Sequence, residues 1–268
     1  GEPTLHKGVP GLPQYAVSKG MKAAMFTNGT NMNADIADSL LACQFVSLSI
    51  NAANCETYKS IMGADRLDKV VANMKYLVKR KGNSMTFICA RMLILPENYL
   101  QIHKVCQMVK EWGLSGFNVR PVDFERSDII GHRKLDIDVE AVKEQFAMCH
   151  EEETADFKVF TVTEKFDSGF HNKQNFTRCL MTPLILPLLQ DGAGYICVDR
   201  KMESKYRLGS AFPDPEQILR WWGSDAHRNL ISSVIPKSDC ANMRCTGQCY
   251  NEQIEKVVIN DEMFLSFP

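Results

Sequence analysis

The stretch FVSLSINAANCETYKSIMGADRLDKVVANMKYLVKRKGNSMTFICARMLIL, residues 45–95, contains a strand, a helical crossover and a second strand. Residues 45–50 and 85–95 are short apolar runs rich in β-branched and aromatic residues, as in buried strands, and Pro96 ends the second run. Between them, residues 55–80 form one amphipathic stretch with apolar residues at helical spacing. Two strands joined by such a crossover are expected to lie parallel in one sheet.

The same alternation continues on both sides of this unit. Strands are expected at residues 22–27 and 116–122, and helices at 34–43, 98–112 and 138–150, with Asn98 capping the second of these helices. This order predicts an α/β fold with a parallel sheet. Ligand sites of such sheets lie at the C-terminal ends of the strands. These ends are residues 27–29, 49–51, 93–97 and 120–123.

Composition limits the partners. Apolar residues make up 45% of the 268 residues and charged residues 24%, which is ordinary for a globular protein. A net charge of −1 creates no positive electrostatic potential that would attract a polyanion, so no nucleic-acid partner is expected. The chain has no apolar run of 18 residues, so we expect no membrane span and a cytoplasmic location.

The ten cysteines fall into two groups. Those before residue 150 are scattered through helix and strand patterns, as small core residues are. The others are clustered within residues 179–249, and clustering in a cytosolic chain indicates metal or redox chemistry. The strand–helix alternation also stops near residue 165, so we divide the chain into domains at 1–165 and 166–268. Short strands near Asp191-Gly192, a helix at 215–222 and an amphipathic helix at 251–258 are expected in the second.

Several short motifs occur in an order that matches one family. Gly1-Glu2-Pro3-Thr4-Leu5 resembles the Gly-Gly-Glu-Pro motif of radical S-adenosylmethionine enzymes, starting after its first glycine. Residues 26–30 (FTNGT) resemble the end of the family's third strand, 46–51 (VSLSIN) its fourth strand, and 56–63 (ETYKSIMG) the following loop and helix. The resemblance covers the chain to about residue 258. It implies a partial (β/α)6 barrel that lacks its first strand, followed by a small α+β cluster-binding domain.

The resemblance also implies S-adenosylmethionine as a cofactor. In the family, the motif's backbone and glutamate hold the cofactor's amino group, and a serine at the position of Ser49 faces its ribose or carboxylate. Ser49 and Asn51 share a strand face. Arg91, within an apolar run, needs a partner, either the cofactor carboxylate or a carboxylate of the protein. The implied binding residues, expected to meet at the barrel mouth, are Gly1, Glu2, Pro3, Thr27, Asn28, Ser49, Asn51 and Arg91.

The cysteine-rich part resembles the auxiliary domains called twitch and SPASM. The resemblance rests on Cys179 and Cys197 with Asp191-Gly192 between them, followed by residues 208–210 (LGS) and 221–224 (WWGS). The resemblance implies one auxiliary 4Fe–4S cluster, since the cysteines are too few for the two clusters of a SPASM domain. Its ligands are expected to be Cys179, Cys197, Cys240 and Cys245, with Cys249 free or replacing Cys245. Four cysteines can also hold zinc.

The family's Cys-x3-Cys-x2-Cys motif, which binds the catalytic cluster, does not occur in the chain. We expect this motif and a second 4Fe–4S cluster on a preceding segment, and expect the chain alone to be inactive. The implied activity is hydrogen abstraction by a 5′-deoxyadenosyl radical from a peptide or from a small molecule such as a sugar. Flavodoxin or ferredoxin would supply the electron. The alternative is a non-catalytic iron–sulfur or zinc-binding protein with a degenerate barrel.

Overall fold

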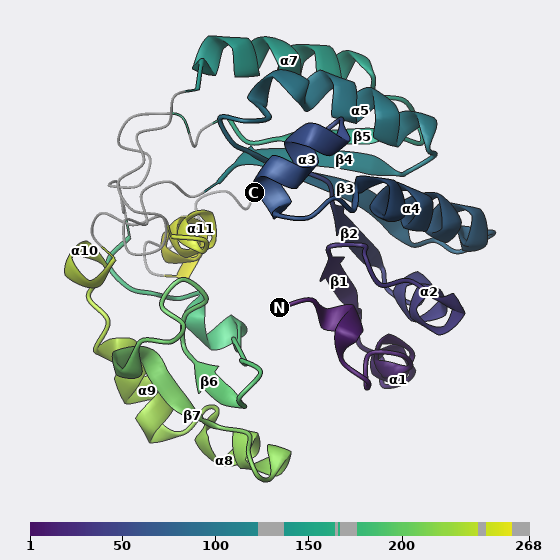
Figure 1. The fold of residues 1–268 in the computed structure, drawn as a ribbon. Coiled ribbons are helices and arrows are strands. Elements are labelled where there is room, and N and C mark those ends of the chain that lie inside the picture. Colours follow the sequence, from purple (N-terminus) through teal and green to yellow (C-terminus); the bar gives the residue numbers. More distant parts are fainter. Residues whose placement is uncertain (123–136, 164–165, 167–175, 241–244, 259–268) are drawn as a thin grey trace, which may run out of the picture. The chain divides into compact units, whose positions relative to one another are not determined.

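The computed structural model describes residues 1–122, 137–163, 166, 176–240 and 245–258 (Figure 1). Asp123, which the sequence places at a strand end, lies outside the described residues. The chain divides into two compact units, Gly1–Phe166 and Asp167–Pro268. The first holds a parallel sheet and the second a small antiparallel one.

The first unit is built on a sheet in the order β1-β2-β3-β4-β5, in which every neighbouring pair is parallel. The strands are β1 (Ala24–Thr27), β2 (Phe45–Ser49), β3 (Phe87–Ile94), β4 (Gly116–Pro121) and β5 (Lys158–Thr161). The predicted α/β class is therefore confirmed, and the four expected strands are present. Two of the four residues of β5 are exposed, so β5 lacks the apolar run by which a buried strand is recognised.

Helices cover one side of this sheet. They are α1 (Leu12–Ser18), α2 (Ala34–Leu41), α3 (Cys55–Met62), α4 (Leu67–Lys81), α5 (Ile102–Glu111) and α7 (Val139–Glu151). Figure 1 shows α2, α4, α5 and α7 along the same side. The amphipathic stretch expected over residues 55–80 is interrupted, because α3 ends at Gly63 in the left-handed conformation (φ +69°). Glycine adopts that conformation without the steric cost of a side chain.

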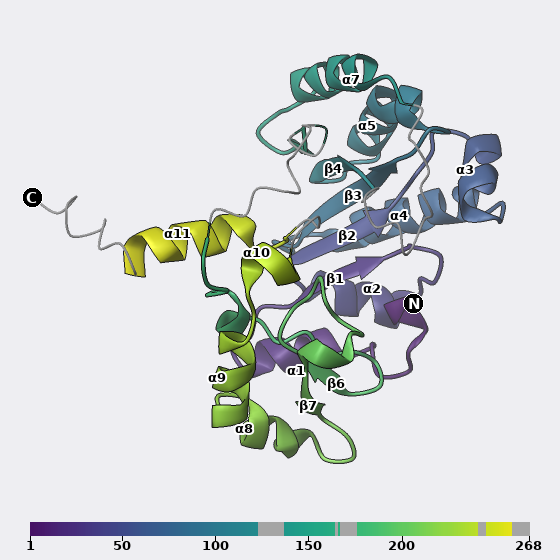
Figure 2. The ribbon, with the colours of Figure 1, turned by 90° about the vertical axis from the view of Figure 1, so that its left-hand side faces the viewer.

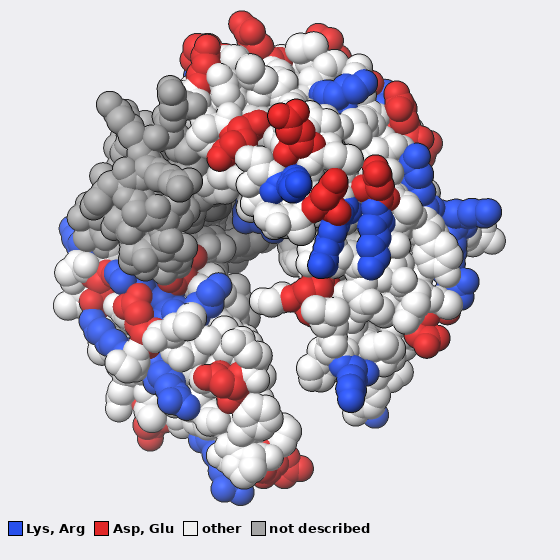
Figure 3. Space-filling view, viewed as in Figure 1, with Lys and Arg blue, Asp and Glu red and all other residues white. Residues whose placement is uncertain are grey.

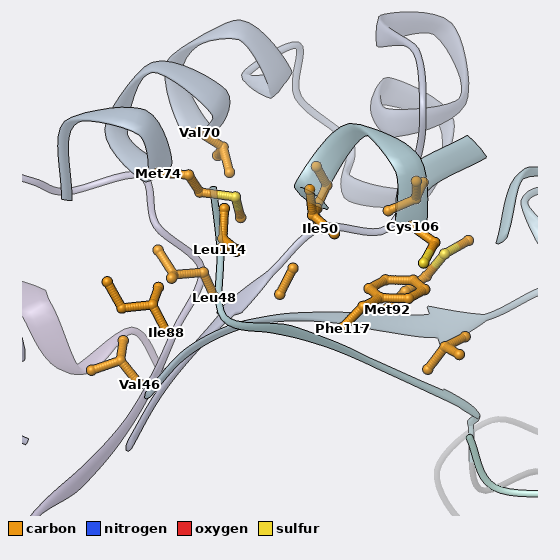
Figure 4. Close-up of a cluster of buried hydrophobic side chains, with 14 of the residues drawn as sticks. Val46, Leu48, Ile50, Val70, Met74, Ile88, Met92, Cys106, Leu114 and Phe117 are labelled. Atoms are coloured by element: carbon orange, nitrogen blue, oxygen red, sulfur yellow. The ribbon is translucent and has the colours of Figure 1, made fainter. Parts of the chain in front are cut away.

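The main core lies between the sheet and these helices (Figure 4). Leu48, Met92 and Phe117 alternate with residues of the other face and have no exposed surface. Val70 and Met74 of α4 are also fully buried and belong to the same cluster. Because successive side chains of a strand point to opposite faces, the residues between these positions point away from the helices.

The opposite face of the sheet carries an aromatic row made of Phe26, Phe45, Phe87 and Phe160. Neighbouring ring centroids are 5.8, 6.0 and 6.1 Å apart. The Phe87 ring lies over Gly116, where a Cβ would come within 2.7 Å of the ring. Toward the strand ends this face becomes polar, because Ser49, Arg91 and Asn118 are neighbours in register. We call this region the polar end of the sheet.

Asn98 joins strand ends and does not cap a helix. Its buried side chain accepts a hydrogen bond from Leu95 N (2.7 Å) and donates to the carbonyls of Asn51 (2.7 Å) and Leu93 (2.9 Å). The predicted cap is wrong, since the Asn98 side chain makes no capping bond and α5 begins only at Ile102. Buried backbone groups that lie beyond the hydrogen bonds of the sheet need other hydrogen-bond partners, and the Asn98 side chain is the partner of three of them.

The second unit contains the antiparallel pair β6 (Ala193–Tyr195) and β7 (Arg207–Ser210). Its helices are α8 (Ile218–Trp221), α9 (Asp225–Ser232), α10 (Pro236–Asp239) and α11 (Gln248–Val258). Both α8 and α9 contact β7 (Figure 2). The Trp221 ring lies against Gly194 and Gly209, where a Cβ would approach it to 2.7 and 2.6 Å. The sequence pattern did not indicate α9, although Ser224 caps it by accepting from His227 N.

No helix in the described part of the chain combines the length and hydropathy needed to cross a membrane. On the face shown in Figure 3, acidic and basic side chains are interspersed and do not separate into large areas of one sign. This distribution agrees with the net charge of −1.

Asn98→Ala should lower the free energy of unfolding by about 1–3 kcal/mol, because it leaves buried backbone groups without partners. Urea denaturation measures the change. Asn83→Ala is the control: Asn83 is exposed, so its replacement should change stability by less than about 0.5 kcal/mol. Equal stabilities of the two variants would contradict the role given to Asn98.

Candidate functional site

The Glu2 carboxylate ties the first residues of the chain to the end of β1. Its Oε1 accepts hydrogen bonds from the hydroxyls of Thr27 and Thr4 (2.6 Å each) and from Thr4 N (3.1 Å). Its Oε2 accepts one from Asn28 N (2.7 Å). The structure thus brings together three of the residues that the resemblance marks for the cofactor: Glu2, Thr27 and Asn28.

Glu2 has one acceptor position left. A carboxylate offers about four lone-pair sites, two on each oxygen, and Oε2 uses one. Burial raises the pKa of Glu2, but hydrogen bonds from Asn28, Thr27 and Thr4 outweigh it, so the pKa lies below its ordinary value. Glu2 is therefore ionised at neutral pH and can accept a further hydrogen bond from a cationic group such as an ammonium.

A side-chain hydrogen bond from Asn31 holds the backbone turn that follows Glu2. Pro3–Leu5 form a 3-10 turn, and Asn31 Nδ2 donates to Thr4 O (2.6 Å). Gly1 is exposed. The backbone around Gly1 is therefore accessible beside the Glu2 carboxylate.

Ser49 and Arg91 lie opposite each other in register at the polar end of the sheet. Ser49 is half-buried, and its hydroxyl has no hydrogen-bond partner among the described residues. The Arg91 guanidinium lies over Phe26, 5.2 Å from the ring centroid. Arg120 of β4 points to the same face, and its buried Nε has no acceptor in the described part of the chain. This region can bind a group that carries hydroxyls or negative charge.

Thr27 and Asn51 have structural partners. Thr27 is opposite Leu48 in register and points toward the helices, with its hydroxyl engaged by Glu2. Asn51 is 9% exposed, and its Oδ1 accepts a hydrogen bond from Leu93 N (3.0 Å). The side chains of Thr27 and Asn51 are therefore hydrogen-bonded at the ends of strands. The Ser49 hydroxyl has no such partner among the described residues, so it can bind a ligand.

In the second unit, the segment around Cys179 is held by helix α11. Asn251, fully buried, accepts hydrogen bonds from Leu180 N (2.7 Å) and Met181 N (2.8 Å). Its Nδ2 lies 3.9 Å from the Cys179 sulfur, and the Thr182 hydroxyl lies 2.6 Å from the same atom. The Cys179 sulfur is therefore held by a hydrogen bond from Asn251 and by a hydrogen bond shared with the Thr182 hydroxyl.

Three further cysteines lie in segments that long-range polar contacts tie together: Cys197, Cys240 and Cys245. The Asp199 carboxylate accepts from Thr246 N and from its hydroxyl, at 2.7 Å each. Arg200 donates to the carbonyl of Asp239, the residue before Cys240. These contacts span 47 and 39 residues of sequence and connect the segments that carry the three cysteines.

The thiols act on one another electrostatically. Burial, followed by the charges of Cys197 and Cys179, raises the pKa of Cys240 to about 11. Burial, followed by the charges of Asp199, Cys240 and Cys179, raises the pKa of Cys245 to about 12. Both thiols therefore lose their protons less readily than a free thiol, and a bound metal cation would favour their ionised forms.

Three of these cysteines line a small cavity. Cys179, Cys197 and Cys245 surround a volume of about 20 Å³, the room for about one water molecule. Within the described residues, no group of three or more His, Cys, Asp and Glu side chains could hold a metal ion. Cys249 is exposed in the first turn of α11.

Known proteins resemble this chain in sequence and in fold, although no family model matches it. The AdoMet-dependent heme synthase of Methanosarcina barkeri is 28% identical over 122 residues, 44% of this chain and 34% of that protein. The antilisterial bacteriocin subtilosin biosynthesis protein AlbA of Bacillus subtilis is 27% identical over 140 residues, 51% of this chain and 31% of that protein. The chain therefore spans about a third of the length of these relatives.

The structure of Streptococcus suis SuiB bound to S-adenosylmethionine matches with a TM-score of 0.62 at 14% identity, over 95% of this chain and 61% of SuiB. SuiB bound to its precursor peptide SuiA matches equally well, with 15% identity. The likeness covers both the parallel sheet and the antiparallel pair. The chain is related to the radical S-adenosylmethionine enzymes. The expected partial radical SAM barrel with a small C-terminal domain is thus confirmed as the fold.

Sequence reasoning did not find the residues that hold Glu2 and the cysteine-bearing segments in place. Thr4, Asp199 and Asn251 belong to this class. The partners of Asp199 and Asn251 lie 47 and 71 residues away, so no local pattern marks them. A partial signal exists for Thr4, which follows Glu2 at the spacing of a local side-chain turn.

Glu2→Gln should lower the melting temperature at pH 7, and its difference from the unsubstituted protein should shrink in acid. The pKa of Glu2 is depressed in the folded state, so its stabilising contribution is complete above the ordinary value of 4.5. It is lost as the pH falls through the folded-state pKa. Thermal melts of both proteins between pH 7 and pH 3 test this expectation, with exposed Glu97→Gln as control. A difference that stays constant over this range would rule out the carboxylate as its source.

Proposed function

We propose that the chain is part of a radical S-adenosylmethionine enzyme that modifies a peptide, and that it contains the larger part of the barrel. The observation that carries the proposal is the Glu2 carboxylate, which is ionised, fixed at the end of β1 and has a free lone pair on Oε2. It occurs where the family's motif holds the amino group of the cofactor. The likeness to SuiB, whose structure contains S-adenosylmethionine, supports the same assignment.

The residues fit a zwitterionic nucleoside-bearing cofactor. Glu2 accepts from its ammonium group, the backbone at Gly1 and Pro3 and the turn at Asn28 line that end, and Thr27 orients Glu2. Ser49 binds the ribose or the carboxylate, Arg91 the carboxylate, and Asn51 holds the strand end that carries Ser49. When bound next to a reduced iron–sulfur cluster, S-adenosylmethionine supplies a 5′-deoxyadenosyl radical, which abstracts a hydrogen atom from the substrate.

The catalytic cluster would be bound outside these residues. A Cys-x3-Cys-x2-Cys pattern does not occur in the 268 residues, so we place it on a preceding segment. Flavodoxin or ferredoxin would deliver the electron. A complete gene that lacks this pattern would favour the alternative, a metal-binding protein without catalytic activity.

A peptide substrate is favoured by the relatives. SuiB has been solved with its precursor peptide SuiA, and AlbA takes part in the biosynthesis of a bacteriocin. A small molecule is the second candidate, because another relative is a heme synthase. Mass spectrometry of a peptide encoded beside the gene, before and after incubation with the reduced enzyme, distinguishes the two: a loss of hydrogen or a new cross-link supports the peptide.

The auxiliary 4Fe–4S cluster is assigned to Cys179, Cys197, Cys240 and Cys245. All four belong to segments that Asn251, Asp199 and Arg200 hold together, and Cys249 is exposed and stands outside this set. Because all four proposed ligands belong to this chain, the auxiliary cluster could assemble in the absence of the catalytic cluster.

Ser49→Ala should weaken the binding of S-adenosylmethionine by about 1 kcal/mol, or roughly fivefold, the value of one hydrogen bond. Isothermal titration of the complete gene product measures it. Ser60→Ala, at an exposed position of α3, should bind normally. Asn51→Ala is less suitable, because it also removes the partner of Leu93 N. Unchanged affinity in Ser49→Ala would show that the cofactor site lies elsewhere.

Anaerobic reconstitution of the chain should give about four iron and four sulfide ions per chain, the content of one cubane cluster. Cys197→Ala and Cys245→Ala should lower the iron content, whereas Cys249→Ala and Cys43→Ala should not. Cys43 is the matched control for loss of a buried thiol, since it lies in the core of the first unit. A colourless protein that holds one zinc ion, or iron that depends on Cys249, would contradict the assignment.

A further inference from the structure

Asn118 and Arg120 lie on β4 at the polar end of the sheet and have no role in the cofactor site proposed above. Phe117 and Val119 of the same strand are fully buried in the core, so Asn118 and Arg120 point to the other face. Both are half-buried. The Asn118 side-chain amide has no partner among the described residues, and the buried Nε of Arg120 has no acceptor among them. These two groups of β4 are therefore available to a ligand.

The charged side chains on this face of the sheet are all positive. They are Arg91, Arg120 and Lys158, and the five strands contain no Asp or Glu. Lys158 is exposed at the start of β5, where water solvates its charge. Arg120 lies near the other end of its strand and is half-buried, with no carboxylate on its own sheet to pair with. A partly desolvated guanidinium in this position favours an anionic ligand.

Arg91 and Arg120 serve different parts of this face. The Arg91 guanidinium lies 5.2 Å from the centroid of the Phe26 ring on β1, and Glu2 is tied to the end of the same strand. β4 is three strands away from β1 in the sheet, about 14 Å at the usual strand spacing. The ammonium and carboxylate of an amino-acid head group are bonded to the same carbon. A cofactor held by Glu2 and Arg91 therefore leaves Arg120 to a second anion.

We propose that Arg120, assisted by the Asn118 amide, binds a carboxylate of the peptide substrate. The inference rests on the function proposed above and adds a requirement: the peptide carries an Asp or Glu residue, or its free C-terminus, close to the position that is modified. A guanidinium donates two parallel N–H groups to a carboxylate, and the amide offers a further donor. Arg120 is a substrate-binding residue in this role, and the contact holds the peptide over the strand ends beside the cofactor site.

The test measures how tightly the complete gene product, with S-adenosylmethionine present, binds the peptide encoded beside the gene. Arg120→Gln should raise the dissociation constant of the peptide at least roughly tenfold, because charge-assisted hydrogen bonds are lost. It should leave the dissociation constant of S-adenosylmethionine unchanged. Arg120→Lys keeps the charge but not the paired donors, so its loss should be smaller. Lys158→Gln is the matched control, since it removes the same charge from the exposed end of the same face.

Variants of the peptide identify the carboxylate. Each acidic side chain is replaced singly by its amide, and the C-terminus is amidated in a further variant. One of these changes should weaken binding to the unsubstituted enzyme as much as Arg120→Gln does, and should have no further effect on Arg120→Gln. Which change does so tells a side-chain carboxylate from the C-terminus.

Equal peptide affinities of Arg120→Gln and Lys158→Gln would overturn the inference, as would losses that add when both partners are changed. Weakened binding of S-adenosylmethionine to Arg120→Gln would also overturn it, because Arg120 would then belong to the cofactor site. If Arg120→Gln does not fold, Arg120→Lys decides by the same comparison. Failure of the unsubstituted enzyme to bind the peptide is a different result, since it would refute the peptide substrate itself.

Discussion

Within the described residues of the first unit, helices bury one face of the five-stranded sheet, and the rest of that unit follows from this constraint. Every residue next to a core residue in a strand must point to the other face. Leu48 is buried among α4 and its neighbours, so Ser49 faces away from the helices. A polar side chain at this position adds little unfavourable desolvation free energy, because the hydrophobic core lies on the opposite face of the sheet. The same alternation that builds the core thus places two of the candidate cofactor residues, Ser49 and Arg91, on the opposite face.

Backbone groups at the ends of the strands need other hydrogen-bond partners, because they lie beyond the backbone hydrogen bonds of the sheet. Asn98 and Asn51 supply side-chain amides to these groups, and Glu2 does the same for Asn28 N at the end of β1. Such side chains stiffen the rim on which a ligand would sit. A binding site built on a rigid rim loses little conformational entropy when it is filled. The structural and the proposed functional roles of Glu2 are therefore compatible.

The second unit relies on a different physical principle. Its antiparallel pair is short, and long-range hydrogen bonds from Asn251, Asp199 and Arg200 connect its segments. Small units with little core commonly need a further link such as a metal site. A cluster bound by four cysteines would provide it, and its binding would be coupled to folding.

The sequence predicted what depends on local pattern and missed what depends on distant contacts. Four strands and most helices were recognisable from apolar spacing, and the fold from motifs in order. Asn98 was assigned to a cap from its place before a helix, yet its partners are Asn51 and Leu93, which no periodicity reveals. The break at Gly63 was overlooked because apolar residues occur on both sides of it, although the buried faces of α3 and α4 are not in one helical phase. Asp199 and Asn251 act across more than forty residues, beyond any local rule.

The cysteines show how burial separates structural thiols from candidate ligands. Cys43, Cys89, Cys106 and Cys149 are buried, and burial raises the pKa of Cys89 to about 12, so the Cys89 thiol stays protonated. Cys240 and Cys245 also have raised pKa values, but they are only partly buried. Long-range hydrogen bonds of Asn251, Asp199 and Arg200 connect the segments that carry Cys179, Cys197, Cys240 and Cys245. Partial exposure together with these connections, more than the pKa of any one thiol, therefore distinguishes the C-terminal group.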